Sequence, residues 1–291
     1  MMNANPLFSV LIANYNNGKY LMEAINSVYA QTYTNWEIIL VDDASTDNSK
    51  EIYKELEKDT RIHIFYNDEN HGCGYTKRRC AELANGELCG FLDPDDMLLP
   101  EAIDKHINVH IKHDDVAIVY SLCYYCDADY NIIGKRNIDL KDNETFFNHR
   151  GSAHLASYKK SYYEKTEGIS EKLKAGVDQD LYFKIEEVGN FYLLKDFTYK
   201  YVARRDTAIT SERNIINLSY WNYEVVRATC IRRNLDFEDI MIKEFRYAIK
   251  NCVPTILKQE MDTIYNSNSY RIGYLILTPF RWIKKLVKKN N

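Results

Sequence analysis

Short apolar runs alternate with amphipathic segments through the first third of the chain. The apolar runs cover residues 7–13, 36–41, 61–66 and 88–92. Runs of this length, bounded by turn residues, are typical of buried β-strands. The segments between them repeat apolar residues at helical spacing, as Leu21, Ala24, Ile25 and Val28 do in the first of them. The pattern therefore predicts four strand and helix units in succession.

Repeated units of this kind predict an α/β fold with a mainly parallel sheet flanked by helices. Ligands bind such sheets beyond the carboxyl ends of the strands. Polar and acidic residues follow three of the predicted strands at this edge: Asn14, Asp42, Asp43, Asp93 and Asp95. We therefore expect these side chains to gather in one crevice.

The rest of the chain predicts further strands and then helices. Residues 116–125 predict a fifth strand, and residues 191–194 and 197–202 predict two more. From Ile215 onward the apolar spacing becomes helical. We expect a main domain over residues 1–205 and a helical C-terminal appendage over residues 206–291.

Composition and charge exclude several classes of protein. Of the 291 residues, 45% are hydrophobic and 27% are charged, as in a soluble globular protein. The net charge of −4 argues against a broad nucleic-acid surface, so we expect no nucleic-acid partner. The first residues do not resemble a secretory signal, and no apolar run is long enough to span a bilayer. The scattered cysteines favour reduced thiols in a cytosol. The pair Cys123 and Cys126 lacks the second pair that a zinc site needs.

Three carboxylates lie within four residues, at Asp93, Asp95 and Asp96, directly after the fourth apolar run. Their mutual repulsion is costly unless a cation or backbone donors balance it. Mg²⁺ and Mn²⁺ prefer such oxygens and are usually held by one or two carboxylates together with substrate phosphates. The alternative is that Asp95 or Asp96 caps a helix that begins near Leu98. An EF-hand is excluded, because its sixth position would be Leu98 instead of glycine.

Two common phosphate-binding loops are absent from the sequence. No G-x-x-x-x-G-K-[ST] motif occurs, and Gly72-Cys-Gly74 lacks the rest of a dinucleotide fingerprint. The sequence therefore disfavours a P-loop protein and an NAD-binding protein.

Three blocks of the sequence resemble the opening of a family 2 glycosyltransferase. They are Phe8-Ser-Val-Leu-Ile-Ala-Asn14-Tyr15-Asn16, Val41-Asp42-Asp43-Ala-Ser45-Thr46-Asp47 and Phe91-Leu-Asp93-Pro-Asp95-Asp96. The blocks occur in the family's order and spacing, and the resemblance covers residues 7–205. It implies a GT-A fold, an inverting reaction, a nucleotide-sugar donor and a divalent metal, Mn²⁺ or Mg²⁺. The nucleotide-sugar half would then be residues 1–97, and the acceptor half residues 98–205.

The resemblance also assigns roles to single residues of these blocks. Asn14 and Tyr15 would line the base pocket, and Asp42 would face uracil or another base edge. Asp93 would serve both the donor's ribose and the metal, and Asp95 would bind the metal. Asp96 is a third acid without a firm role.

A basic pair precedes the fourth predicted strand. Thr76-Lys77-Arg78 stands where the family often has Ala-Arg-Asn, so Lys77 and Arg78 keep a positive charge for the donor. The resemblance leaves open which of the two approaches the diphosphate.

A second acidic segment, Gly176-Val177-Asp178-Gln179-Asp180, opens a predicted helix where the family commonly has Gly-Glu-Asp. The match places the general base on Asp178, although Val177 replaces a glutamate. Acids are also favoured in the first turn of a helix for structural reasons, which is the role we expect for Asp180. The family's histidine after the last strand is replaced by Ala203-Arg204-Arg205-Asp206, and Arg205 is either a diphosphate ligand or a surface arginine.

Three histidines share one side of a predicted helix. His106, His110 and His113 have a spacing that could hold a metal. No acid accompanies them on that side, so we expect a solvated helix face.

The resemblance implies an inverting glycosyltransferase that moves a sugar from a nucleoside-diphosphate sugar, which we expect to be UDP-linked. The acceptor would be a hydroxyl of a glycan or a lipid-linked molecule, as in surface polysaccharide synthesis. Two alternatives remain open. One is a non-catalytic nucleotide-sugar-binding protein, and the other is a nucleotidyltransferase, which usually needs a glycine-rich phosphate loop near the first strand.

Residues 273–289 form a basic, amphipathic segment with aromatic residues on its apolar side. This pattern resembles an interfacial membrane helix. Each Lys or Arg near an anionic bilayer contributes about 1 kcal/mol. The alternative is that the apolar side packs on the main domain, since Pro279 interrupts the helix. We therefore expect a cytoplasmic enzyme, with this segment either at the inner face of the membrane or packed on the protein.

Overall fold

The computed structural model describes residues 3–138, 140, 144–149, 154–202 and 215–242. Arg205 and the segment 273–289 lie outside these residues. The chain divides into two compact units, Met1–Arg233 and Asn234–Asn291. The predicted main domain ended at residue 205. The first unit extends further along the chain and includes helix α8 (Ile215–Arg232). Among the described helices, none combines the length and the apolar character needed to cross a bilayer.

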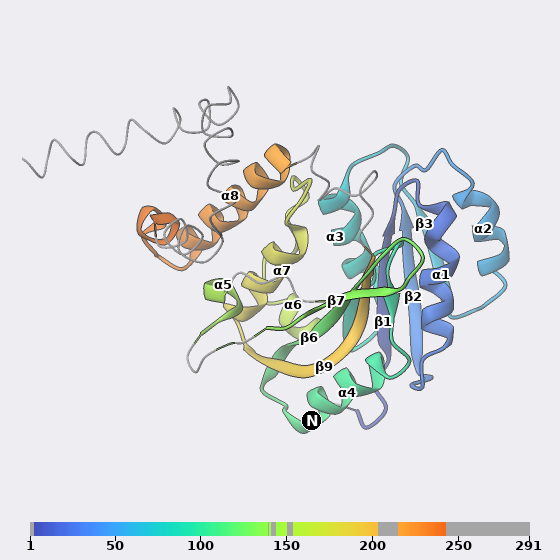
Figure 1. The fold of residues 1–291 in the computed structure, drawn as a ribbon, viewed down its shortest axis with the longest axis horizontal. Coiled ribbons are helices and arrows are strands. Elements are labelled where there is room, and N and C mark those ends of the chain that lie inside the picture. Colours follow the sequence, from blue (N-terminus) through green and yellow to red (C-terminus); the bar gives the residue numbers. More distant parts are fainter. Residues whose placement is uncertain (1–2, 139, 141–143, 150–153, 203–214, 243–291) are drawn as a thin grey trace, which may run out of the picture. The chain divides into compact units, whose positions relative to one another are not determined.

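The N-terminal half of the sheet consists of four parallel strands (Figure 1). They are β1 (Phe8–Asn14), β2 (Trp36–Asp42), β3 (Ile62–Tyr66) and β4 (Leu88–Phe91), in the order β3-β2-β1-β4. Between them run α1 (Gly18–Tyr29), α2 (Ser49–Leu56) and α3 (Cys73–Leu83). The register of β1 and β2 sets Asn14 beside Asp42 at the carboxyl edge. This half confirms the units that the apolar pattern predicts.

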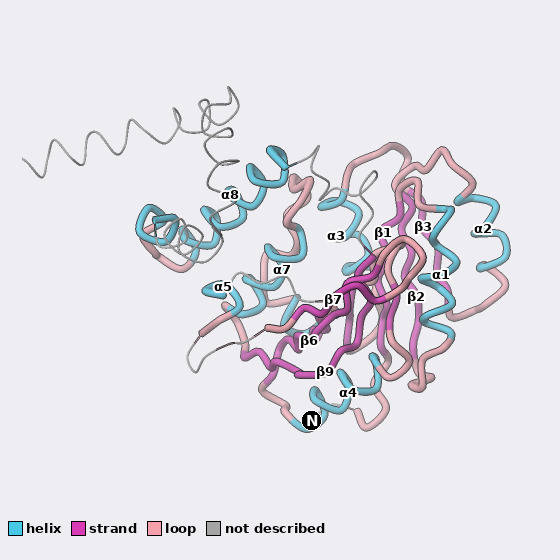
Figure 2. Tube along the Cα trace, viewed as in Figure 1, coloured by secondary structure: helices cyan, strands magenta, loops and turns pink. Residues whose placement is uncertain are grey.

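The C-terminal half of the sheet adds antiparallel neighbours. β8 (Ala156–Lys159) lies between β4 and β6 (Val116–Cys126) and is antiparallel to both. β9 (Asn190–Val202) is one strand parallel to β6, where the sequence predicted two. Two short strands, β7 (Ile132–Arg136) and β5 (Met97–Leu98), pair antiparallel with β6 and β9. The α/β class is confirmed, with helices flanking the strands (Figure 2). The pairing directions make the complete sheet mixed.

Helices cover both faces of this sheet (Figure 1). On one face, α1, α2 and α4 (Ala102–Lys112) share a core cluster with alternate residues of β1, namely Phe8, Val10 and Ile12. On the other face, α3 packs against β1 and β2, and α7 (Val177–Glu186) packs against β6. The helices α3 and α7 also contact each other, so residues from both can meet at the carboxyl edge. Two single-turn helices, α5 (Phe146–His149) and α6 (Lys160–Tyr163), flank β8 in the chain.

The predicted solvated face of α4 is wrong for two of its three histidines. His106 and His110 are fully buried. The ring nitrogens of His106 lie 2.8 Å from Ser157 Oγ and 3.0 Å from Ser121 Oγ, and His110 Nε2 lies 3.0 Å from Ser157 Oγ. Burial lowers the pKa of each imidazole to about 3, so both rings are neutral. Their spacing marked the inward side of the helix, where hydroxyls of β6 and β8 contact both ring nitrogens of His106 and Nε2 of His110.

Candidate active site

The carboxyl ends of β1 and β2 carry a buried polar network. Asn14 donates from Nδ2 to the Tyr53 hydroxyl at 2.7 Å, and this hydroxyl donates to Asp42 Oδ1 at 2.6 Å. Asp42 Oδ2 accepts the N–H of Ser45 at 2.9 Å. Asn14 and Asp42 are buried, whereas Tyr15 is exposed beside them. Asn14 and Asp42 thus support the strand ends from inside, and contact of these three residues with a base stays a prediction.

Asp43 organises the loop that leads into α3. Its Oδ1 accepts Asn67 Nδ2 at 2.7 Å and the N–H of His71 at 3.0 Å, and its Oδ2 accepts the N–H of Gly72 at 2.8 Å. Gly72 has φ +91°, a conformation that residues with a side chain rarely adopt. The acid at the end of β2 and this glycine together fix the start of α3, the helix that carries Lys77.

The acidic loop after β4 is held in place by β9. Asp96 is buried and accepts the Tyr199 hydroxyl at 2.9 Å and the N–H of Val202 at 2.8 Å. The N–H of Asp93 donates to the same Tyr199 hydroxyl at 3.2 Å. Burial, and then the charges of Asp95 and Asp93, raise the pKa of Asp96 well above its usual value. Asp96 therefore supports the loop. The capping alternative is wrong, because β5 follows the acids and α4 begins only after it.

A buried lysine joins the two acidic segments. Lys77 donates from Nζ to Asp93 Oδ1 at 3.0 Å and to Asp178 Oδ1 at 2.8 Å. The Lys77 side chain is 7% exposed, whereas those of Asp93 and Asp178 keep 32% and 26%. Burial alone would lower the pKa of Lys77, but attraction to Asp178 and Asp93 raises it well above its usual value. Burial likewise disfavours the charged form of Asp93, yet Lys77 brings the pKa of that carboxyl below its ordinary value.

Asp178 stands in the first turn of α7, as predicted. The residue before the helix, Gly176, has φ +69°. A Cβ at this glycine would lie 3.0 Å from Asn222 Oδ1 and 3.4 Å from a methyl carbon of Val225, both on α8. The positive φ and the close approach of α8 together favour glycine at this turn, and Asp178 follows it in contact with Lys77.

Arg78 adjoins Lys77 in the sequence but serves another purpose. Its Nε donates to Glu82 Oε1 at 2.8 Å, and its Nη1 donates to the carbonyl oxygens of Glu167 and Ile169 at 3.2 and 3.1 Å. These bonds hold the loop before α7 against α3. Of the two basic residues, Lys77 is the one that reaches the acids.

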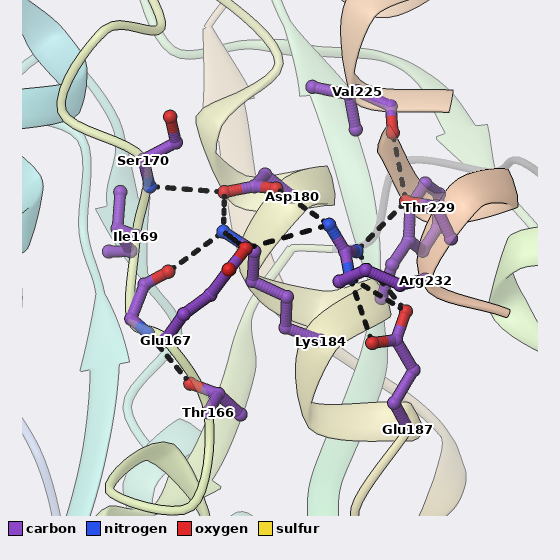
Figure 3. A network of polar contacts seen from close by, with 12 residues as sticks. Thr166, Glu167, Ile169, Ser170, Asp180, Lys184, Glu187, Val225, Thr229 and Arg232 are labelled. Carbon is purple, nitrogen blue, oxygen red and sulfur yellow. Dashed lines mark hydrogen bonds and ion pairs between the residues drawn. The ribbon is translucent and has the colours of Figure 1, made fainter. Parts of the chain in front are cut away.

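The second acid of α7, Asp180, belongs to a polar network with Lys184 and Ser170 (Figure 3). Asp180 Oδ2 accepts Lys184 Nζ at 2.7 Å and the N–H of Ser170 at 3.1 Å. Lys184 also donates to the carbonyl oxygen of Gly168 at 2.8 Å. The side chains of Asp180 and Lys184 are only 4% and 3% exposed. These contacts agree with the structural role that we expected for Asp180.

His154 is a residue of this site that sequence reasoning missed. Its ring stacks on Tyr199 and Tyr201, with centroid distances of 5.3 and 5.5 Å. Burial lowers the pKa of its imidazole, and attraction to Asp93 and Asp178 opposes this shift. His154 enters the site just before β8, a strand whose place between β4 and β6 the apolar pattern did not reveal. No periodicity or motif marked it.

The acidic residues of the site fit a metal that is shared with a substrate. The described residues contain no cluster of three or more His, Cys, Asp or Glu side chains arranged to hold a metal ion. Asp93 and Asp95 follow β4, and the Asp93 side chain is partly exposed, at 32%. Mg²⁺ and Mn²⁺ sites commonly take one or two protein carboxylates and complete their coordination with phosphate oxygens and water. The donor set suits such a site and does not form a closed cage.

Sequence comparisons place these features in a known family. Residues 9–169, more than half of the chain, match the model of glycosyl transferase family 2. Chondroitin synthase of Escherichia coli is 27% identical over 244 residues, which is 84% of this chain and 34% of that protein. The uncharacterized glycosyltransferase MJ1057 of Methanocaldococcus jannaschii is 29% identical over 225 residues, with 74% of this chain and 78% of that protein covered.

A shorter match is the putative teichuronic acid biosynthesis glycosyltransferase TuaG of Bacillus subtilis, 38% identical over 108 residues. It covers 37% of this chain and 43% of that protein. The chain thus spans about a third of the chondroitin synthase and less than half of TuaG.

Solved structures share the fold. S. aureus TarS 1-349 in complex with UDP-GlcNAc superposes with a TM-score of 0.64 at 21% identity, covering 77% of this chain and 65% of that one. The complex of the same protein with UDP gives a TM-score of 0.62 at 20% identity, covering 77% of this chain and 64% of that one. This likeness confirms the GT-A arrangement of strands and helices.

Proposed function

Because the chain belongs to glycosyl transferase family 2, we propose that it transfers a sugar, with inversion, from a UDP-linked donor to an acceptor hydroxyl. The acceptor that we propose is a glycan or a lipid-linked glycan in surface polysaccharide synthesis. Support comes from the TarS complexes with UDP and UDP-GlcNAc and from the named relatives, a chondroitin synthase and a putative teichuronic acid glycosyltransferase. The observation that carries the proposal is the convergence of Asp93 and Asp178 on Lys77 Nζ.

Asp178 is the proposed general base. It stands in the first turn of α7, where the helix dipole favours a carboxylate. Its carboxylate takes the proton of the acceptor hydroxyl while the hydroxyl oxygen bonds to the anomeric carbon, and the nucleoside diphosphate leaves from the opposite face. A single displacement inverts the anomeric centre and requires one base only.

Asp93 and Asp95 are the residues that would hold a divalent metal. A metal at this position supplies Lewis-acid stabilisation of the charge that develops on the leaving diphosphate. Lys77 adds a second positive charge at the same place, since its Nζ already contacts Asp93. We further propose that Tyr15 contacts the base and that Arg205 binds the diphosphate.

Donor and reaction class can be tested together. The full-length protein is incubated with a panel of nucleotide sugars and Mn²⁺ or Mg²⁺, and release of nucleoside diphosphate is followed with and without EDTA. Slow metal-dependent release of UDP from one donor is expected. Donor binding without any release, with or without glycan acceptors, would favour a non-catalytic binder. Exchange of pyrophosphate into a nucleotide sugar would favour a nucleotidyltransferase.

For the C-terminal segment 273–289, the proposal is that it places a cytoplasmic enzyme at the inner face of the membrane, beside a lipid-linked acceptor. The support is its basic, amphipathic sequence. The test compares the full-length protein with a variant in which Lys284, Lys285, Lys288 and Lys289 are replaced by Glu. The unmodified protein should sediment with anionic vesicles at low salt and be released at high salt. Equal sedimentation of both proteins would contradict the proposal.

A further inference from the structure

Lys77 lies where one cation balances two carboxylates. Its Nζ is hydrogen bonded to one oxygen of Asp93 and to one oxygen of Asp178, so these two oxygens are separated by no more than the span of two hydrogen bonds. Carboxylates this close repel each other, and without a cation one of them tends to take up a proton. The ring of Phe91 lies 5.0 Å from Nζ and adds a favourable cation–π contact. The ammonium thus lies where it offsets the negative charge of both carboxylates.

We propose that Lys77 is an exchangeable counter-ion, which pairs with Asp93 in the ligand-free enzyme and releases it when a divalent cation arrives together with the donor diphosphate. This inference rests on the proposed function, in which Asp93 is a metal ligand. It adds a consequence that the proposed function alone does not contain: metal and donor bind interdependently because Lys77 competes for the same carboxylate oxygen.

Charge explains why the exchange needs both ligands. A divalent cation alone at Asp93 would stand next to a buried ammonium, and like charges in a partly buried site repel strongly. A diphosphate cancels the charge of the cation and offers Lys77 Nζ new oxygen acceptors. The metal alone therefore binds weakly, and each ligand increases the affinity for the other by the same factor.

The sealed pair of Lys184 and Asp180 provides a matched control within the same protein. Lys184 is also a buried lysine that contacts a carboxylate of α7. Its other contacts within the described part of the chain are the carbonyl oxygen of Gly168 and the carboxylate of Glu167, and so include neither Asp93 nor Asp178. Removing its charge should not change the affinity of Asp93 for a cation.

The experiment measures Mn²⁺ binding to the full-length protein without nucleotide, from the electron paramagnetic resonance signal of free Mn²⁺ at pH 8. Lys77→Met should bind Mn²⁺ at least about tenfold more tightly than the unmodified protein, because Asp93 and Asp178 then face each other without a cation. UDP should also increase its Mn²⁺ affinity less. Lys77→Arg and Lys184→Met should keep the weak Mn²⁺ binding of the unmodified protein. Equal or weaker Mn²⁺ binding by a folded Lys77→Met protein would overturn the proposal.

A second measurement uses the unmodified protein and so does not depend on the folding of Lys77→Met. The ¹H–¹⁵N signal of the Lys77 ammonium, assigned by its loss in Lys77→Arg, should shift when Mg²⁺ and UDP are added together and stay in place with Mg²⁺ alone. An unchanged signal at saturating Mg²⁺ and UDP would also overturn the proposal.

The two proposals can fail separately. If the unmodified protein transfers sugar and Lys77→Met binds Mn²⁺ no more tightly, the proposed function holds and only the counter-ion role of Lys77 is rejected. If Lys77→Met binds Mn²⁺ more tightly but the unmodified protein transfers no sugar from any donor, the counter-ion role holds and the proposed catalytic function is rejected.

Discussion

Two buried lysines pair with carboxylates of helix α7 in different surroundings. Lys77 reaches Asp178 near the start of the helix, and Lys184 reaches Asp180 one turn before it on the same helix. Asp180 is sealed at 4% exposure, whereas Asp178 keeps 26%. Burial of the ammonium is therefore common to both pairs. The exposure of the partner carboxylate is what distinguishes a pair that can exchange its ligands from one that holds the fold together.

Helix α8 adds further polar contacts to α7, close to the buried pair of Lys184 and Asp180. Arg232 makes a two-pronged contact with Glu187, with Nε to Oε2 at 2.9 Å and Nη2 to Oε1 at 3.1 Å (Figure 3). Arg233 donates to the carbonyl oxygen of Phe183 at 2.7 Å. The end of α7 is thus anchored while its first turn carries Asp178 in contact with Lys77, which suits a helix that presents a catalytic side chain from a rigid support.

The largest expected effect tests the sealed pair. Lys184→Met removes the cation that contacts the buried Asp180 carboxylate at 2.7 Å and leaves only Arg232, at 4.0 Å from its Oδ1. Breaking a buried pair in this way costs about 3–5 kcal/mol of unfolding free energy. Urea denaturation followed by circular dichroism measures the loss. Lys77→Met should cost clearly less, since water can reach Asp93 and Asp178. Equal losses for the two variants would remove the distinction between the pairs.

The next effect tests the two acids of α7 against each other. Asp178→Asn should lower turnover by about a hundredfold or more, because the acceptor proton loses its base. Donor binding, measured by calorimetry, should change little. The control is Asp180→Asn, which should lower the unfolding free energy and keep most of the turnover per folded molecule. Full turnover in Asp178→Asn would reject it as the base.

The free energy of unfolding should depend on pH because two histidines of α4, His106 and His110, are buried. The pKa of His106 and of His110 is about 3 in the folded protein and near 6.5 in an unfolded chain. Between these values the unfolded chain binds more protons, so stability is complete above about pH 6.5 and is lost as the pH falls toward 3. Each histidine contributes about 1.4 kcal/mol per pH unit within this window.

Replacing one of these histidines tests the linkage. In His110→Gln, the dependence of unfolding free energy on pH between 6 and 4 should be shallower by about the contribution of one histidine. His113→Gln is the matched control, since His113 is exposed at the end of the same helix. An unaltered slope in His110→Gln would show that the pair does not couple folding to pH.

The smallest effect concerns the anchor of α8. Arg232→Gln should reduce the unfolding free energy by about 1 kcal/mol, as expected for a partly exposed ion pair with good geometry. Arg227→Gln is the control on the same helix, because its contact with Glu224 is longer, at 3.8 Å, and more exposed. If Arg232→Gln lost as much unfolding free energy as Lys184→Met, Arg232 would contribute to stability as strongly as the pair of Lys184 and Asp180.

Much of the nucleotide half could be predicted because its order is local. The strands β1 to β4 are apolar runs followed by polar turns, and parallel strands joined by helices bring their carboxyl ends to one edge. The apolar pattern alone therefore predicts that Asp42 and Asp93 lie at the same edge. Residue type and the family's spacing likewise marked Asp178.

Long-range contacts could not be predicted in the same way. Nothing in the local pattern places β8 between β4 and β6, or sets the Asp96 carboxylate against the Tyr199 hydroxyl and the backbone of β9. His154 reaches the site for the same reason. For α4, the helical period was correct, but the sequence alone did not show that the hydroxyls of Ser121 and Ser157 contact both ring nitrogens of His106 and Nε2 of His110.

The sequence by itself determined the strand and helix units, the acids at the strand ends and the family, since these depend on residue type and on spacing within short segments. Only the tertiary structure decided which basic side chain pairs with which carboxylate. Lys77 and Arg78 are adjacent in the chain, yet only Lys77 meets Asp93 and Asp178. Successive residues of a helix point about 100° apart, so the packing of α3 against the sheet and α7 brings only one of the two to Asp93 and Asp178.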